Sequence, residues 1–370
     1  MKRTAVAPFV LATALVLAAC GSNAGSPTSA GPSATADVGR AATVTPVDAG
    51  VLQAARTEGE VLLYTNSEEQ QMTPMIKAFE AANPGIEVRS LTLGNQEMFQ
   101  RYETEVASGG STADVVMSSD AVGWLSFLRG GNVADYTDPN TPNLPDYALL
   151  GKGVYAFSED PVIAVFNKAV LPENKQPTSM AELAKMAPQL DGKIGATAIS
   201  NVIQFGATSA YLDKYGDAGW QTLERIGAHA GLESDNGPLV TKLAQGQYAA
   251  AFFVSGAVRA FIVGDVAKVV NYRYLTDGTP LLPRAAAVTS QAKHPNAAKV
   301  WLNWLLSTKG QEAACAGGFT PYRDGVKCAF GLPQVKAIVG EDNLIIGAYD
   351  PALATEQPRI VARFNKAFGR

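Results

Sequence analysis

Residues 58–80 constrain the fold most, because they combine the pattern of a buried strand with that of an amphipathic helix. Residues 61–64 form a short apolar run of the β-rich type found in buried strands. Four apolar side chains then recur at helical spacing, Met72, Met75, Ile76 and Phe79. The polar residues 65–69 lie between the two patterns. The stretch therefore predicts a strand that leads directly into a helix.

Two starting points for this helix are compatible with the sequence. Ser67 with Gln70 three residues later is typical of a capping box. Thr73 as N-cap, with Pro74 at the first helical position, is an equally good start. In either case the strand end exposes backbone N–H groups at the start of a helix, where open α/β sheets bind ligands.

The same alternation of strand and helix recurs along the chain. Strands are predicted at 86–91, 114–117, 193–198 and 248–254, and helical patterns at 96–108, 124–128, 220–226 and 295–307. Such alternation predicts an α/β fold with a mostly parallel sheet. Four of the strands are followed by hydroxyl or amide side chains: Asn66-Ser67, Ser118-Ser119-Asp120, Ser200-Asn201 and Ser255.

Two further stretches predict connections between two lobes. Extended apolar runs at 154–157 and 162–166 flank Ser158-Glu159-Asp160-Pro161, which favours a crossover into a second lobe. Residues 272–284 contain the turn Asp277-Gly278-Thr279-Pro280 and are expected to return the chain to the first lobe.

Composition narrows the class of protein. The chain has 370 residues, of which 47% are hydrophobic and 17% charged, values that are ordinary for a globular protein and argue against disorder. The formal net charge is −4. Since no basic stripe or aromatic-interleaved Lys/Arg cluster is present, a nucleic-acid partner is not expected.

The N-terminus has the layout of an export signal. Lys2 and Arg3 precede an uncharged apolar segment, 5–19, that is too short to span a membrane comfortably. Residues 17–21, Leu-Ala-Ala-Cys-Gly, resemble the bacterial lipobox, which implies a signal peptide at 1–19 and a lipid on Cys20. A plain signal with a chance cysteine is the alternative. Residues 20–50 are predicted to be a Gly/Ser/Ala/Pro-rich tether that anchors the protein to the extracytoplasmic side of a membrane.

The remaining cysteines are Cys315 and Cys328. Exported proteins meet oxidising conditions, so a disulfide between these two is expected. Two free buried thiols are the alternative.

Several motifs in order resemble the bacterial extracellular solute-binding proteins of ABC importers. The resemblance runs from about Val51 to Val326 and includes Pro84-Gly85-Ile86-Glu87-Val88, Ala113-Asp114-Val115-Val116, Asp277-Gly278-Thr279-Pro280 and Leu305-Leu306-Ser307-Thr308-Lys309-Gly310-Gln311. The most similar branch is the ferric-iron, thiamine and phosphorylated-solute group. The resemblance implies two α/β lobes joined by two crossing strands, with the ligand in the cleft between them. It also implies permease and ATPase partners, no cofactor and a monomeric protein.

We expect the first lobe to comprise residues 51–158 and 278–325, and the second 159–277 and 326–370. Ligand-binding family members that hold an anion do so near positions matching Ser200, Asn201, Asn236 and Ser255. Together with the other strand-end residues and a counter-charge, the predicted ligand set is Asn66, Ser67, Ser119, Asp120, Ser200, Asn201, Asn236, Ser255 and Arg284. Arg259 and Arg273 are the other candidate counter-charges.

No metal site is predicted. The iron-binding branch uses adjacent tyrosines after the later strand, whereas this chain has Phe252-Phe253-Val254-Ser255-Gly256 there. His229, placed on a helix, and His294, placed before a helix, are expected to be structural. Hydroxyl and amide groups beside free N–H groups instead suit a small anionic or phosphorylated organic solute.

Three alternatives stay open at this point. A ferric-iron or thiamine binder would belong to the same branch. A ligand-sensing lipoprotein for a membrane kinase would need the same cleft. An exported hydrolase would need a nucleophile and a base, and the sequence has no G-x-S-x-G elbow, so no catalytic residue is assigned.

Overall fold

The computed structural model describes residues 44–369. The predicted signal peptide, the lipidation of Cys20 and most of the predicted tether lie outside the described residues and stay predictions. The first helix, α1, begins at Ala49, just inside the stretch expected to be tether.

The first lobe is built on a parallel three-stranded unit in the order β2-β1-β3. β10 joins this unit antiparallel to β3 and pairs in parallel with β11. β4 pairs antiparallel with the long strand β5, which is described below. Val61 and Leu63 of β1 and Val115 of β3 are fully buried in its core. The strands of this lobe are β1 (Glu60–Thr65), β2 (Glu87–Thr92), β3 (Val115–Ser118), β4 (Leu149–Gly151), β10 (Pro280–Val288) and β11 (Ile345–Ile346).

The second lobe has its own parallel unit, in the order β8-β6-β7. A second core lies here, with Leu183, Leu223 and Phe252 among its fully buried side chains. The strands are β6 (Ile194–Thr197), β7 (Ala230–Glu233), β8 (Ala250–Ser255) and β9 (Val270–Arg273).

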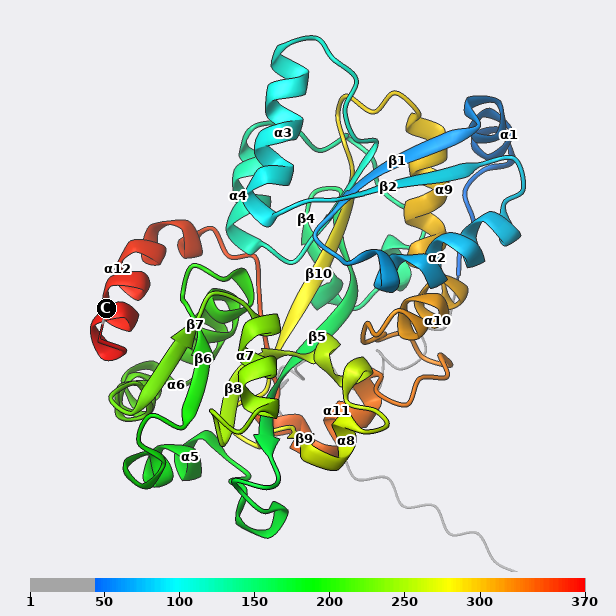
Figure 1. Ribbon diagram of the computed structural model, residues 1–370. Helices are drawn as coiled ribbons and strands as arrows, with labels where there is room; N and C mark the ends of the chain where they lie inside the picture. Colours follow the sequence, from blue (N-terminus) through cyan, green and yellow to red (C-terminus); the bar gives the residue numbers. More distant parts are fainter. Residues whose placement is uncertain (1–43, 370) are drawn as a thin grey trace, which may run out of the picture. The chain divides into compact units, whose positions relative to one another are not determined.

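One long strand, β5 (Val154–Asn167), belongs to both lobes, and β10 runs antiparallel beside it (Figure 1). The first half of β5 pairs with β10, and its second half pairs with β8 and β9. The two apolar runs predicted for this region are thus one continuous strand, since residues 158–161 between them are extended and buried. The predicted α/β fold with two crossing strands is confirmed.

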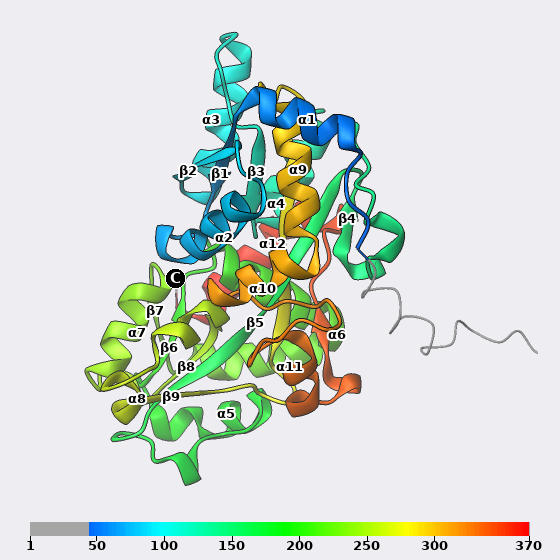
Figure 2. The ribbon, with the colours of Figure 1, turned by 90° about the vertical axis from the view of Figure 1, so that its right-hand side faces the viewer.

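Helices cover both sheets. Figure 2 shows α1 lying across α9 on one face of the first lobe. The helices are α1 (Ala49–Glu58), α2 (Glu69–Ala82), α3 (Asn95–Ala107), α4 (Ala121–Arg129), α5 (Met180–Met186), α6 (Val202–Gly227), α7 (Asn236–Ala244), α8 (Val266–Val269), α9 (Pro295–Leu305), α10 (Thr308–Ala316), α11 (Leu332–Val339) and α12 (Ala352–Ala367).

The start of α2 differs from both predicted positions. Glu68 is the N-cap and forms a capping box with Gln71. Gln71 Oε1 accepts from the backbone N–H of Glu68 at 3.1 Å, which moves the box by one residue. Pro74 lies inside the helix rather than at its first position. Its missing N–H leaves one carbonyl of the first turns without its usual partner.

The expected lobe boundaries stay a prediction. Leu332, Val335 and Val339 of α11 pack in the same core as Trp301 of the first lobe. Helix α12 instead contributes Ile360 and Phe364 to the core of the second lobe. Cys315 and Cys328, for which a disulfide was expected, are bonded to each other.

Candidate functional site

The carboxyl ends of β1 and β3 place the first group of predicted site residues. Asn66 follows β1 directly, and its Nδ2 donates to Oγ of Ser119, beyond β3, at 3.1 Å and to Oδ1 of Asn95 at 2.6 Å. Arg284 of β10 donates from Nη1 to Oδ1 of Asn66 at 2.8 Å and to Oγ of Ser67 at 3.3 Å. The guanidinium therefore holds the two loops in one hydrogen-bonded network.

Arg284 also forms a buried ion pair with Asp160 of β5. Its Nε lies 3.1 Å from Asp160 Oδ2, and the side chains are only 6% and 12% exposed. Asp160 Oδ1 accepts from Ser158 Oγ at 3.1 Å and from the backbone N–H of Thr320 at 2.9 Å. These bonds compensate the loss of hydration on both charges. The hydrogen bonds of Arg284 use its Nε and Nη1, which leaves Nη2 for a ligand.

Asp120 has a structural task as the N-cap of α4. Its Oδ1 accepts from the backbone N–H of Gly123 at 3.0 Å, while its own N–H donates to Ser118 Oγ at 3.1 Å. Burial raises the pKa of the Asp120 carboxyl, an effect that bonds from backbone N–H groups partly oppose. A carboxyl group of this kind can accept a hydrogen bond or, when protonated, donate one.

The second lobe contributes a second group at the start of α6. Asn201 is the N-cap of this helix, and its Oδ1 accepts from the backbone N–H groups of Ile203 and Gln204. Its Nδ2 donates to Oδ1 of Asp235 at 3.2 Å. The predicted Asn201 is therefore engaged in fixing the helix start to the β7–α7 junction, and the adjacent Ser200 is exposed.

Asn236 and Ser255 are linked to each other. Asn236 Oδ1 accepts from the backbone N–H of Ser255 at 3.1 Å, and Ser255 Oγ accepts from the backbone N–H of Ala257 at 3.4 Å. Ser255 thereby caps η6 (Gly256–Phe261). Two residues earlier, Phe253 has a positive φ of 51°, which is rare for a bulky side chain and often marks a functional segment.

The two groups meet at a small gap, which we call the interlobe gap. Ser119 and Arg284 line it from the first lobe, Asp160 from β5 and Ser255 from the second lobe, and its volume is about 10 Å³. A larger cavity of about 610 Å³ lies between α3, α4, α6 and α12, and both Asp120 and Ser200 line it. Asn66, Ser67, Asn201 and Asn236 do not line either space. They support residues that do, or cap neighbouring elements.

Sequence reasoning missed part of this environment. Asp160 was assigned to the crossover only, although its carboxylate neutralises Arg284. The larger cavity also has amide side chains that were not predicted: Gln96, Gln100, Gln357 and Asn365. The first two lie on the exposed face of a predicted helix, where a polar residue carries no special signal. The last two lie on α12, for which no helix had been predicted.

The other candidates have structural contacts. Arg259 donates from Nε to the carbonyl of Gly256 at 2.7 Å and from Nη2 to Thr320 Oγ1 at 2.8 Å. Arg273 donates to Gln176 Oε1 at 3.1 Å. Both therefore tie loops together, and neither lines the interlobe gap.

The histidines lie away from the gap. His294 Nδ1 lies 2.9 Å from Asp114 Oδ2 and the residue precedes α9, as expected. His229 lies just beyond the end of α6 rather than on a helix, with Nδ1 2.7 Å from Asp191 Oδ1. Within residues 44–369 no group of three or more His, Cys, Asp or Glu side chains is arranged to hold a metal ion. Likewise, none of the helices described there is long and apolar enough to cross a bilayer.

Comparison with known proteins places this geometry in context. Residues 65–312 match the family described as bacterial extracellular solute-binding protein. A comparison with curated protein sequences finds no match.

Solved structures resemble the chain over most of its length. The substrate-binding protein of an ABC transporter from Agrobacterium tumefaciens is 21% identical, with 85% of this chain and 97% of that chain covered and a TM-score of 0.72. Iron-bound HitA from Pseudomonas aeruginosa is 19% identical, with 83% and 99% covered and a TM-score of 0.67. AfuA from Actinobacillus pleuropneumoniae, bound to fructose-6-phosphate, is 16% identical, with 84% and 99% covered and a TM-score of 0.65. At these identities the likeness establishes the fold.

Proposed function

This chain belongs to the bacterial extracellular solute-binding proteins, and we propose that it binds a small anionic or phosphorylated organic solute for an ABC importer. The family resemblance expected from the sequence is confirmed, and the family binds solutes rather than catalysing reactions. The observation that carries the proposal is the meeting of Ser119, Asp160, Ser255 and Arg284, from both lobes and a crossing strand, at the interlobe gap. At about 10 Å³ the gap has room for about one water molecule, so the lobes must move apart to admit the anion.

The chemistry of the gap supports an anion. Ser119 and Ser255 offer hydroxyl groups, and the Nη2 branch of Arg284 offers a charged donor that suits an oxyanion. The nearest carboxylate, Asp160, is already paired with Arg284 and with two further donors. An incoming anion therefore meets the hydroxyl and guanidinium donors, while the negative charge of Asp160 is already compensated.

The larger cavity is our proposed place for the organic part of the solute, because Asp120, which lines it, follows Ser119 of the gap. Amide and hydroxyl groups line it together with the carboxyl groups of Glu103 and Asp120, and Phe99 and Phe205 add apolar surface. Such a mixture suits a polar organic body attached to the anionic group. AfuA, which has the same fold, was solved with a sugar phosphate, and this favours a phosphate ester among the candidate anions.

Delivery follows from the two-lobe architecture. A solute that contacts Ser119 in one lobe and Ser255 in the other stabilises the arrangement in which the lobes are close together. A permease with its ATPase would then receive the solute from the closed form. The predicted lipid on Cys20 would keep a monomeric receptor on the extracytoplasmic side of the membrane.

A thermal-shift panel tests the ligand class. The mature chain is incubated with phosphate esters, phosphonates, carboxylates, thiamine or Fe(III), and we expect one of the organic anions to raise Tm. The Ser255→Ala variant should lose much of that shift, whereas Ser29→Ala in the predicted tether is a matched control and should retain it. Stabilisation by Fe(III) or thiamine, with no effect of any organic anion, would reverse the assignment. Loss of solute uptake on deletion of the gene would support transport over sensing by a kinase.

A further inference from the structure

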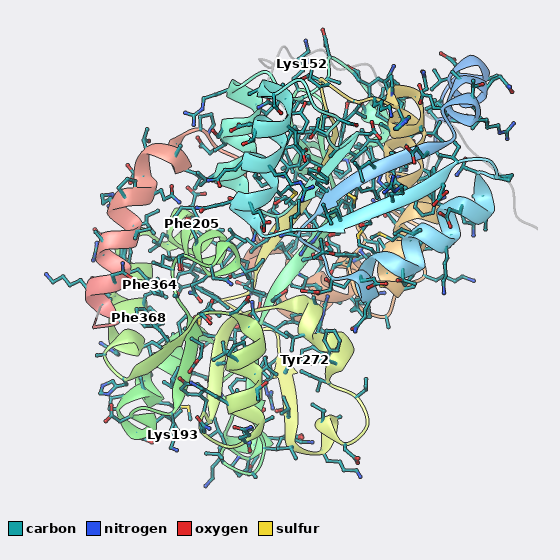
Figure 3. The ribbon with its side chains drawn as sticks, turned by 45° about the horizontal axis from the view of Figure 1, so that its top comes forward. Lys152, Lys193, Phe205, Tyr272, Phe364 and Phe368 are labelled. Atoms are coloured by element: carbon teal, nitrogen blue, oxygen red, sulfur yellow. A yellow bond between two sulfur atoms is a disulfide. The ribbon has the colours of Figure 1, made fainter. Side chains whose placement is uncertain are left out.

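A second cavity, which we call the α6 cavity, lies on the side of α6 that faces the C-terminal segment. Its volume is about 480 Å³. Ser119 and Ala121 line it from the first lobe, Leu282 and Pro283 line it from β10, and α6 supplies one wall. Ser119 and Leu282 also line the interlobe gap, so the two spaces adjoin. Residues 346–350 and the first half of α12 supply the opposite wall. Figure 3 labels Phe205 on α6, on the side of the molecule where α12 passes.

The inner surface of the α6 cavity is aromatic and apolar. Phe205, Trp220 and Tyr349 line it and are each less than 9% exposed, and Leu282 adds an aliphatic surface. The hydroxyl of Tyr349 donates to the carbonyl of Pro283 at 3.1 Å, which fixes the ring. The guanidinium of Arg363 lies 4.5 Å from the ring centroid of Trp220. Trp220 therefore already makes a cation–π contact with Arg363.

The rim of the same cavity is acidic. Asp213, Asp217, Asp350 and Glu356 line it, against the single cation Arg359. Glu356 Oε2 accepts from Arg359 Nε at 2.7 Å, so this pair largely cancels. Asp217 is 3.8 Å from Arg363, which does not line the cavity, so Asp213 and Asp350 are the lining carboxylates without an ion pair among the described residues. The rim thus favours a positive charge, and the apolar floor favours a hydrocarbon body.

One buried polar group lacks a partner in this wall. Ser209 of α6 lines the α6 cavity and is 7% exposed. Its Oγ is buried and has no hydrogen-bond partner among the described residues. An uncompensated buried hydroxyl costs stability, and an occupant that donates an N–H to it would remove that cost.

We propose that the α6 cavity is a second binding site, next to the interlobe gap, for an organic ammonium ion with an aromatic or aliphatic body. The body packs on Trp220 and Tyr349, and the ammonium group lies among the rim carboxylates. Because the walls come from α4, β10 and α6, the occupant contacts both lobes and a crossing strand. It therefore favours the lobe arrangement seen here, independently of any anion in the gap.

Three probes of one size test the charge preference. Calorimetric titrations at pH 7 use phenethylamine as the cation, phenethyl alcohol as the neutral analogue and phenylacetate as the anion. We expect the amine to bind at least fivefold more tightly than the alcohol, and phenylacetate to bind more weakly than both. Equal binding of the amine and phenylacetate, or no binding of the amine, would overturn the proposal.

Variants locate the binding. Asp213→Asn combined with Asp350→Asn should reduce the preference for the amine over the alcohol to less than twofold while the alcohol binds as before. Asp146→Asn combined with Glu87→Gln, two exposed acids away from the cavity, should change nothing. Ser255→Ala should also leave amine binding unchanged, which separates this site from the proposed anion site. A preference that survives in the Asp213/Asp350 variant, or that disappears in the Ser255 variant, would contradict the assignment.

Discussion

At the scale of single residues, Glu159 of β5 predicts a dependence of stability on pH. Its side chain is fully buried, and neither carboxyl oxygen has a hydrogen-bond partner among the described residues. Burial, and next the nearby Asp160, raise the pKa of Glu159 well above its usual value. The folded protein therefore retains a proton that the unfolded chain loses near pH 4.3. Stability from this group is present below that pH and is lost as the pH rises through the folded-state pKa.

The Glu159→Gln variant should remove this dependence. Each pKa unit between the folded and unfolded carboxyl corresponds to about 1.4 kcal/mol. We expect the variant to exceed the wild type in unfolding free energy by at least about 1 kcal/mol at pH 8, with a smaller difference at pH 5. Urea unfolding at several pH values measures this, with the exposed Glu69→Gln as control. Parallel pH profiles for the wild type and Glu159→Gln would show that Glu159 is ionised in the fold.

Arg284 and Asp160 form the second residue-scale prediction. Arg284→Met leaves the Asp160 carboxylate buried without its cation, so we expect a loss of about 3–5 kcal/mol of unfolding free energy. Asp160→Asn in the same chain should recover part of this loss, because it removes the unpaired charge. A double-mutant cycle in urea measures the coupling. Additive effects of the two substitutions would mean that the ion pair contributes nothing beyond its separate contacts.

At the scale of elements, the sequence predicted the strand–helix alternation because each element has its own periodicity. The strand at 61–64 and the amphipathic pattern around Met72 and Phe79 needed no tertiary information. The junctions at Ser119 and Ser255 were likewise local. The local pattern could not predict contacts between residues far apart in the chain. Asp160 meets Arg284, 124 residues away, because β5 and β10 pair antiparallel with Leu282 opposite Asp160 and Arg284 opposite Ser158. The sequence analysis did not predict helix α12, which lines both the larger cavity and the α6 cavity.

The disulfide predicts a local effect on the crossing strand. Cys315 lies in the last turn of α10, and the segment up to Cys328 includes Thr320. The N–H of Thr320 donates to Asp160, and its carbonyl accepts from the N–H of Glu159. Replacing both cysteines by serine should lower the unfolding free energy by about 3 kcal/mol, because the unfolded chain gains freedom.

Hydrogen exchange checks the local part of this prediction. The amide of Thr320 should exchange faster in the double serine variant. Amides of β6, in the second lobe, serve as the control and should change only as much as the unfolding free energy of the whole protein does. The wild type under reducing conditions is a second route to the same state. An unchanged unfolding free energy in both would show that the loop is already held by its other contacts.

At the scale of the whole molecule, the proposed solute should couple the two lobes. Each lobe has its own core, and the chain passes between them through β5 and β10. A ligand bound only to the native state at one hundred times its Kd adds about 2.7 kcal/mol to the unfolding free energy. If that ligand contacts Ser119 and Ser255 together, it must stabilise both lobes rather than one.

Native-state hydrogen exchange distinguishes these cases. With the organic anion found in the thermal-shift panel, amides of β1 in the first lobe and of β6 in the second should gain protection by the same factor. Ser119→Ala and Ser255→Ala should each reduce the gain in both lobes, because each removes a contact from one side of the same ligand. Protection confined to β6 would place the solute on the second lobe alone. In that case Ser119 and Arg284 would line the gap without contacting the ligand. The ligand would then not be what brings the two lobes together.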